Sequence, residues 1–174
     1  MEMDLDHHRY ADYKTLLLYC HRAAGVVGQA AAEIFGYANH QTLKYAHELG
    51  IAFQLTNIIR DVGEDAMRGR IYLPQEELAR FGVTPAEILN RHSSPRFQDL
   101  MQFQYARAVQ AYDHALSLLP GEDRKAQRAG LAMAAIYRTL LEEIRRGDFA
   151  VLHTRTSLPP LRKLWLAWKA AAFA

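Results

Sequence analysis

Residues 54–65 read QLTNIIRDVGED, and no other segment of this 174-residue chain divides polar from apolar side chains so informatively. Successive residues of a helix are rotated by about 100°. At that rotation a polar set falls within roughly 80°, and it consists of Gln54, Asn57, Asp61, Asp65 and Arg68. The opposite side carries Leu55, Ile59, Val62 and Ala66. The segment therefore predicts an amphipathic helix with an apolar face and a row of oxygen ligands.

Asp61 and Asp65 are the only aspartates in the chain that are four residues apart. Two carboxylates one helical turn apart form a hard, oxygen-rich site of the kind that Mg²⁺ prefers. Arg60, Arg68 and Arg70 lie close in sequence, and arginine pairs well with phosphate oxygens. Together these residue types indicate an enzyme that grips a diphosphate through Mg²⁺.

The composition excludes several other classes of protein. The net charge of +2 is small and no basic run is interleaved with aromatic residues, so we expect no nucleic-acid binding. One cysteine cannot form an internal disulfide, and the eight histidines lack zinc-ligand spacing. There is no glycine-rich nucleotide loop and no Gly-x-Ser-x-Gly motif. No signal peptide is present and no apolar run reaches the roughly 18 residues of a membrane span, so we expect a cytoplasmic protein.

Helical spacing dominates the chain, and strand signals are nearly absent. Hydrophobic residues make up 50% of the sequence, enough for the core of one all-helical domain over residues 1–174. We expect helices over residues 12–35, 41–67, 75–80, 94–119 and 122–146, and a last helix that starts at residues 159–160. Thr84 and Glu87 have capping-box spacing, and Gly147 is expected at the C′ position after residue 146. The fold class is therefore all-α, a helical bundle.

Two segments of the chain form recognisable motifs. Residues 19–28 read YCHRAAGVVG, and residues 54–65 are followed by RGRIYLP at 68–74. The first resembles the pattern Tyr-Cys-x-x-Val-Ala-Gly-x-Val-Gly of the squalene/phytoene synthase family, the head-to-head prenyl synthases, with Ala23 in place of valine. The second is similar to the second aspartate-rich motif of the same family. The order and separation of the motifs match as well. Within the family, the chain is most similar to bacterial presqualene diphosphate synthases of hopanoid biosynthesis, and phytoene synthases share nearly the same core motif.

The resemblance implies an isoprenoid-synthase-type bundle and a Mg²⁺-dependent transferase. It would join two prenyl diphosphates head to head, with farnesyl diphosphate as the first expectation and geranylgeranyl diphosphate as the alternative. Asn57, Asp61 and Asp65 match the metal ligands of the family, and Tyr19 joins the two aspartates as a catalytic candidate. The candidates for substrate binding are Gln54, Arg60, Arg68, Arg70, Tyr72, Val26 and Gly28.

Several of these residues also allow a purely structural interpretation. Arg60 could pair with Glu64 one helical turn later. Gly28 could serve only to let two helices approach closely. Tyr72 could be a core aromatic residue, and Tyr137 is a weaker candidate for the wall of a substrate cavity.

A full-length family member carries a further N-terminal part, which contains a first Asp-x-x-x-Asp motif and part of the cavity wall. Asp4 and Asp6 do not have the spacing to replace that motif. We therefore expect this chain to correspond to the C-terminal portion of a synthase, without its N-terminal helices, and to be inactive by itself. A non-catalytic helical partner subunit is the alternative, and a terpene cyclase or trans-prenyltransferase is a weaker one.

The last expected helix has an apolar stripe formed by Leu161, Leu164, Trp165 and Trp168. Arg162, Lys163 and Lys169 lie beside it. The stripe could dock on the bundle, which is the favoured interpretation. It could instead lie in a membrane interface, where tryptophan and lysine are common, so a peripheral membrane contact is the second expectation. The sequence predicts no oligomeric state.

Overall fold

The computed structural model describes residues 9–172, and these residues form helices without any extended strand. The α-helices are α2 (Tyr13–Cys20), α3 (Val26–Phe35), α4 (Gln41–Met67), α5 (Gln75–Phe81), α6 (Pro85–Leu89), α7 (Pro95–Ser117), α8 (Arg128–Arg146) and α9 (Pro160–Ala172). Short turns of other helix types are His21–Gly25, Gly121–Asp123 and Ala150–Leu152. The expected all-α fold is confirmed. None of the described helices is both long and apolar enough to cross a membrane.

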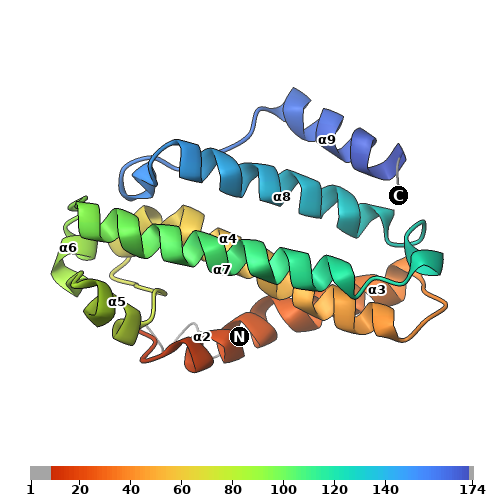
Figure 1. Ribbon diagram of the computed structural model, residues 1–174, viewed down its shortest axis with the longest axis horizontal. Coiled ribbons are helices and arrows are strands. Elements are labelled where there is room, and N and C mark those ends of the chain that lie inside the picture. The colour runs from red at the N-terminus through yellow and green to blue at the C-terminus, as the bar shows by residue number, and fades with distance from the viewer. Residues whose placement is uncertain (1–8, 173–174) are drawn as a thin grey trace.

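Helix α4 is the axis around which the other long helices pack (Figure 1). It has 27 residues, and about half of them are buried. Helices α3, α7 and α8 all contact it, whereas α9 packs on α8 at the outer edge of the bundle. The sequence predicted the bounds of α4 correctly because its heptad-like apolar spacing is uninterrupted from Thr42 to Ala66.

Local signals fix where most of the helices begin. The Asp12 carboxylate accepts a hydrogen bond from the Thr15 amide at 2.7 Å and caps α2. Thr84 and Glu87 form the expected capping box at the start of α6. The expected helix over residues 12–35 exists, but a π-helical turn at His21–Gly25 divides it into α2 and α3. Such turns insert one residue and re-aim the helix that follows.

One expected boundary and one expected capping position are wrong, and the expected end of the helix at Arg146 is confirmed. The helix expected from residue 122 begins only at Arg128, because the Asp123 carboxylate accepts hydrogen bonds from the Ala38 and Asn39 amides and from the Thr42 hydroxyl. These contacts hold Asp123 against the α3–α4 connection. At the other end, Gly147 is not the C′ residue that was expected, because it caps α8 with an ordinary negative φ of −87°. The residues with left-handed backbone are Asp148 and Phe149, and the side chain of Phe149 is buried.

Helices α3 and α4 approach so closely that glycine is required at the crossing. A Cβ on Gly28 would lie 2.2 Å from the Ala46 carbonyl oxygen, and a Cβ on Gly50 would lie 2.4 Å from the Ala24 carbonyl oxygen. Both distances are far below van der Waals contact. Gly28 is therefore required for the close approach of the two helices, and this crossing aligns the motif at residues 19–28 with the motif on α4.

Candidate active site

The polar face of α4 has the geometry expected from its sequence. Asn57, Asp61 and Asp65 follow one another at intervals of one turn and are half-buried. The apolar residues Leu55, Ile59, Val62 and Ala66 are buried in the core. The three oxygen-bearing side chains therefore form a row along one partly shielded side of the helix.

Asp61 lies between two arginines. The Arg60 guanidinium donates to it, with Nε 2.7 Å from Oδ1, and Arg155 Nε donates to the same oxygen at 2.9 Å. Burial favours the protonated carboxyl, but these two hydrogen bonds outweigh it and hold the pKa of Asp61 below its ordinary value. The expected alternative pairing of Arg60 with Glu64 is wrong, since Arg60 turns to its neighbour Asp61 and Glu64 lies 3.5 Å from Arg155.

Arg155 is the functional candidate that the sequence did not reveal. It lies in the segment between the turn at Ala150–Leu152 and α9, which has no helical period, and it meets Asp61 across 94 residues of sequence. Together Arg60 and Arg155 line a cavity of about 240 Å³ with Tyr137 and Lys163. Tyr137 lines this cavity and not the apolar one between α3, α4 and α8, and its place in a substrate cavity stays a prediction.

The side-chain oxygens of Asn57 and Asp65 are partly buried and lack, among the described residues, enough hydrogen-bond donors or positive charge to offset the cost of burial. Asn57 Oδ1 is buried and has no hydrogen-bond partner within residues 9–172. Burial, and then the negative charge of Asp61, raise the pKa of Asp65 to about 6. A buried acceptor without a donor and a carboxylate that resists ionisation are both stabilised by a cation.

These observations fit a divalent metal with Asn57, Asp61 and Asp65 as ligands. The set is sparse, because the described residues contain no cluster of three or more His, Cys, Asp or Glu side chains that could hold a metal ion. Mg²⁺ usually completes its shell with waters and substrate phosphates, so two carboxylates and an amide are a reasonable protein contribution.

Tyr19 and Tyr72 meet at the edge of this row. Their ring centroids are 5.2 Å apart, and both pack on Tyr10, which the sequence did not suggest. The Gln54 amide Nε2 lies 3.4 Å from the Tyr19 hydroxyl oxygen. The two sequence motifs therefore come together, as their resemblance to a single site implied.

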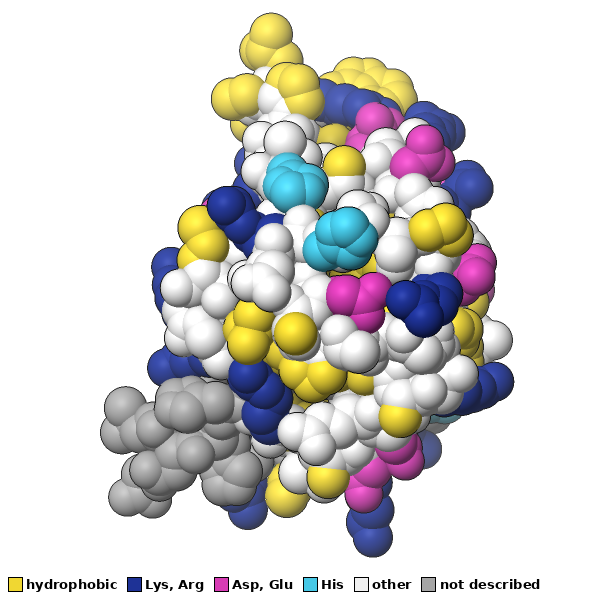
Figure 2. All heavy atoms as spheres, turned by 90° about the vertical axis from the view of Figure 1, so that its left-hand side faces the viewer, with side chains coloured by type: hydrophobic (Ala, Val, Ile, Leu, Met, Phe, Trp, Pro, Cys, Tyr) yellow, Lys and Arg dark blue, Asp and Glu magenta, His cyan; other side chains and the backbone are white. Residues whose placement is uncertain are grey.

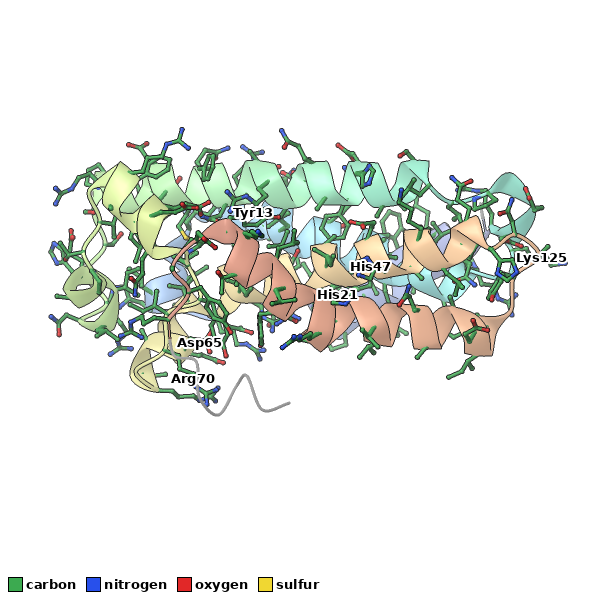
Figure 3. The ribbon with its side chains drawn as sticks, turned by 90° about the horizontal axis from the view of Figure 1, so that it is seen from below. Tyr13, His21, His47, Asp65, Arg70 and Lys125 are labelled. Carbon is green, nitrogen blue, oxygen red and sulfur yellow. The ribbon has the colours of Figure 1, made fainter. Side chains whose placement is uncertain are left out.

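The arginines after α4 differ in their positions. Arg70 is half-buried near Asp65, as Figure 3 shows, and lines a small cavity with Asp65 and Tyr72. Arg68 is exposed and ends α4. Both positive charges lower the pKa of Asp65 and oppose the larger effects of burial and Asp61.

Figure 3 also places His21 beside His47, with Nδ1 of the first 2.6 Å from Nε2 of the second.

An apolar cavity of about 210 Å³ lies between α3, α4 and α8. Its wall includes Ala23, Val27, Gly28, Gly50, Phe53 and Met133. Phe53 packs on Tyr137 at a centroid distance of 4.8 Å and is the last α4 residue in the wall, so the cavity ends about one helical turn before Asn57, the first residue of the row. Gly28 lines the cavity, and its contact with substrate stays a prediction. Val26 does not line the cavity and is 48% exposed, whereas its neighbour Val27, itself 59% exposed, borders the cavity.

Comparisons with known proteins agree with this arrangement. The squalene/phytoene synthase family model matches residues 1–162. The chain belongs to the squalene/phytoene synthase family. It is 39% identical to a phytoene synthase of Arthrospira platensis, in an alignment that covers 93% of this chain and 57% of the relative. It is 41% identical to a phytoene synthase of Mycobacterium tuberculosis, with 99% and 57% covered.

Solved structures of the family have the same helical fold. A crystal structure of a dehydrosqualene synthase with a ligand superposes with a TM-score of 0.77 at 29% identity, covering 98% of this chain and 60% of the other. The squalene synthase HpnC from Alicyclobacillus acidocaldarius gives a TM-score of 0.73 at 25% identity, covering 85% and 56%. The family member described here thus has the all-α isoprenoid synthase fold and spans little more than half the length of these relatives.

Proposed function

We propose that this chain supplies the diphosphate-binding row and part of the prenyl-binding cavity of a synthase that joins two prenyl diphosphates head to head. The observation that carries the proposal is the row Asn57, Asp61 and Asp65 beside an apolar cavity. A prenyl diphosphate has the same two parts, a highly charged head and a greasy tail. The family membership supports the same assignment.

In the proposed reaction, the bond between C1 and the diphosphate oxygen of one substrate breaks, and diphosphate leaves with the electron pair. The C2–C3 double bond of the second substrate attacks the allylic cation. Loss of one proton then closes a cyclopropane, and the second diphosphate is retained in the product. Each step needs a site that stabilises diphosphate and keeps water from the cation.

The described residues are suited to these tasks. Asn57, Asp61 and Asp65 would hold Mg²⁺, which when bound neutralises the charge that grows on the leaving diphosphate. Arg60, Arg155 and Arg70 lie where their N–H groups can bind phosphate oxygens. The apolar wall around Phe53 excludes water from the reacting carbons.

The Tyr19 hydroxyl is the proposed group for moving the proton. It lies in an aromatic cluster, close to the first residue of the α4 motif, and Gln54 orients it through a contact of 3.4 Å. A phenol in this place can accept the proton that leaves the second substrate while it donates its own O–H proton to the released diphosphate, so that the hydroxyl stays neutral.

Two substrate lengths are candidates. Relatives named phytoene synthase, at 36–41% identity, favour geranylgeranyl diphosphate, a C20 substrate. The neighbours named dehydrosqualene synthase and squalene synthase, at 29% and 25% identity, favour farnesyl diphosphate, a C15 substrate. The sequence identities make the longer substrate the better supported of the two, although the motifs alone first suggested the shorter.

We propose further that the isolated chain binds its ligands without turnover. The apolar cavity has exposed residues in its own wall, namely Val27, Phe35 and Met133, so solvent reaches it from one side. A reaction through an allylic cation needs a closed cavity. A non-catalytic partner subunit, the second candidate function, would have the same open cavity.

The test incubates the chain with Mg²⁺ and radiolabelled farnesyl or geranylgeranyl diphosphate, and it measures pyrophosphate binding by calorimetry in parallel. We expect Mg²⁺-dependent binding of pyrophosphate by the chain and no C30 or C40 product. Condensation by the isolated chain would overturn the proposed incompleteness. Absence of Mg²⁺-dependent pyrophosphate binding would overturn the assignment of the row.

A further inference from the structure

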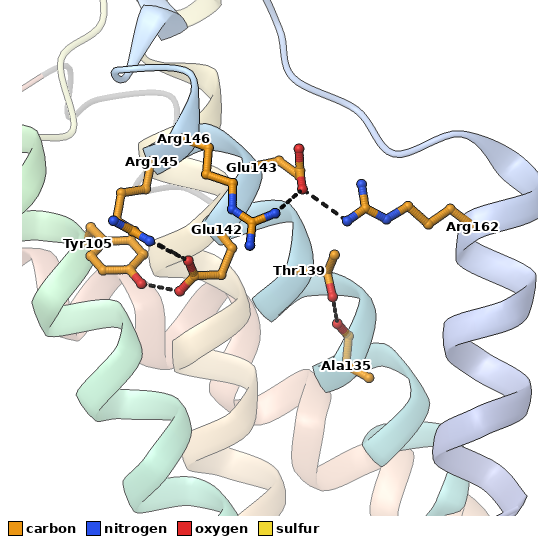
Figure 4. A network of polar contacts seen from close by, with 8 residues as sticks. All are labelled: Tyr105, Ala135, Thr139, Glu142, Glu143, Arg145, Arg146 and Arg162. Atoms are coloured by element: carbon orange, nitrogen blue, oxygen red, sulfur yellow. Dashed lines mark hydrogen bonds and ion pairs between the residues drawn. The ribbon is translucent and has the colours of Figure 1, made fainter.

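Helix α9 is attached to the bundle by one side only. Leu166 and Ala170 are half-buried toward α8, and Arg162 forms an ion pair with Glu143 at 2.9 Å. Figure 4 shows this pair, with Arg146 on the same Glu143 carboxylate. Helix α8 therefore fixes the rotation of α9 about its axis, and with it the direction of every other side chain on α9.

The side of α9 that faces away from α8 is apolar. Leu161, Leu164, Trp165 and Trp168 are 80%, 66%, 54% and 67% exposed. At about 100° per residue these four positions share a sector of about 100°, which we call the α9 stripe. Hydrophobic side chains gather at the top of Figure 2, over the edge of the molecule where Figure 1 places α9. The expectation that this stripe docks on the bundle is wrong, because Leu166 and Ala170 make the docking contact instead.

The charges around the α9 stripe are all positive. On the same helical projection, Arg162 and Lys169 lie along one border of the stripe, whereas Lys163 lies about 150° from the centre of the stripe, on the side that faces the bundle. Residues 160–172 contain no Asp or Glu. The Lys169 ammonium lies 5.2 Å from the Trp165 ring centroid, so a cation is held directly beside the apolar surface. A stripe of tryptophan and leucine bordered by lysine and arginine is typical of helices that lie in a lipid–water interface.

We propose that the α9 stripe binds the surface of a membrane that contains anionic lipids. The apolar side chains would enter the interface, and the cations at its border would meet lipid phosphates. A second copy of the chain is a poorer occupant, because the cations at the border would face each other, and lysine is depleted from protein interfaces.

The position of α9 relative to the candidate site fixes which side of the chain a membrane would cover. Lys163, at the start of the helix, lines the same cavity as Arg60 and Arg155. The α9 stripe faces the opposite way from Lys163, so a membrane on the stripe would lie on the outer side of α9 and would leave this cavity uncovered.

The chain contains its own reporter for this proposal. Both of its tryptophans, Trp165 and Trp168, lie in the α9 stripe. Vesicles of phosphatidylcholine mixed with phosphatidylglycerol should shift tryptophan emission to shorter wavelength, and brominated lipid should quench it. Vesicles of phosphatidylcholine alone should bind roughly 10- to 30-fold more weakly, as expected for the contribution of a few cations.

Two variants separate the contributions in a vesicle sedimentation assay. Trp165→Ser with Trp168→Ser should weaken binding at least about tenfold on both kinds of vesicle. Lys169→Gln, which removes the cation beside Trp165, should weaken it only on anionic vesicles. The matched control, Val27→Ser with Ile34→Ser, removes exposed apolar side chains from α3 and should bind as the wild type does. All of these side chains lie at the surface, and Val27 also borders the apolar cavity. Circular dichroism will verify that each variant keeps the helix content of the wild type.

Three outcomes would overturn the proposal. One is unchanged tryptophan emission with anionic vesicles. Another is vesicle binding that the α3 variant abolishes and the α9 variants do not. The third is a dimer in sedimentation velocity that the tryptophan variant dissociates, which would make a second copy the occupant. No prenyl diphosphate and no Mg²⁺ enter these measurements, so their result is independent of the proposed reaction.

Discussion

Asp61 is the residue on which most of the polar contacts of the site converge. It accepts from Arg60 and Arg155, and it raises the pKa of Asp65 by its charge. Replacing it by asparagine removes one of two metal-binding charges while keeping the shape of the side chain. We expect Asp61→Asn to weaken Mg²⁺-dependent pyrophosphate binding by at least about tenfold, since hard cations depend on charged oxygens.

Calorimetry with pyrophosphate at fixed Mg²⁺ measures this effect. Asp99→Asn is the matched control, because Asp99 is an exposed aspartate on α7, away from the polar row of α4. Equal affinities for wild type and Asp61→Asn would remove Asp61 from the ligand set. In a complete synthase, the same substitution should lower turnover by orders of magnitude.

Asp65 predicts a dependence of stability on pH. Burial and the charge of Asp61 raise its pKa from 3.8 to about 6. A carboxyl with a raised folded-state pKa favours the folded state below the unfolded-state pKa, and this contribution is lost as the pH rises through about 6. Asp65→Asn should therefore stabilise the metal-free chain at pH 7.5, by on the order of 1 kcal/mol after allowance for its partial exposure.

Urea denaturation of wild type and Asp65→Asn at pH 4 and pH 7.5 tests this prediction. The gain in the free energy of unfolding should be present at the higher pH and nearly absent at the lower one. A gain of the same size at both pH values would mean that ionisation of Asp65 is not its cause. Added Mg²⁺ and pyrophosphate should reduce the gain at pH 7.5, because ligand binding stabilises the wild type.

At the scale of single residues, the sequence predicted side chains that repeat along one helix and missed those that arrive from elsewhere. Asn57, Asp61 and Asp65 share a face because of helical geometry alone. Arg155 reaches Asp61 only because the segment before α9 folds back over α4, a contact across 94 residues. Nothing in the local pattern around Arg155 signals that return.

At the scale of helices, the crossing of α3 and α4 is the contact that tolerates least change. A Cβ on Gly28 would lie 2.2 Å from the Ala46 carbonyl oxygen, and both groups belong to backbone that cannot rotate away. We expect Gly28→Ala to lower the free energy of unfolding by about 1–3 kcal/mol, the usual cost of overpacking. Thermal or urea unfolding will measure the loss.

Gly121→Ala is the matched control for that substitution. A Cβ on Gly121 would meet nothing within 4 Å, so we expect a change within about 0.5 kcal/mol. If Gly28→Ala changed the free energy of unfolding as little as this control does, α3 and α4 could not approach as closely as the structure has them. The wall of the apolar cavity would then need another arrangement, since α3 and α4 form two of its sides.

Helix boundaries show which elements a sequence specifies by itself. The bounds of α4 follow from periodicity, and the start of α6 follows from its capping box. The start of α8 does not, because the carboxylate of Asp123 is engaged by the α3–α4 connection 81–85 residues earlier. The rotation of α9 is equally non-local, and an amphipathic pattern alone could not say which of its faces meets α8.

At the scale of the whole molecule, apolar surface is unevenly distributed. Besides the α9 stripe, α3 exposes Val27 by 59% and Ile34 by 83%, two turns apart on one side. Val27 also lines the apolar cavity, so this exposed side borders the opening of the cavity. Contiguous exposed apolar surface of this kind is uncommon in proteins that stay monomeric.

We therefore expect the isolated chain to self-associate as its concentration rises, through α3 rather than through its charged faces. Val27→Ser with Ile34→Ser should reduce this association and leave the free energy of unfolding within about 0.5 kcal/mol for each exposed site. Sedimentation velocity over a range of concentrations will measure the association. If the double variant associates as strongly as the wild type, another surface is responsible and the open side of the cavity does not drive contact. If the association falls, the side of the cavity that solvent reaches is also the surface through which copies of the chain meet, and the exposed apolar side chains of α3 drive the contact.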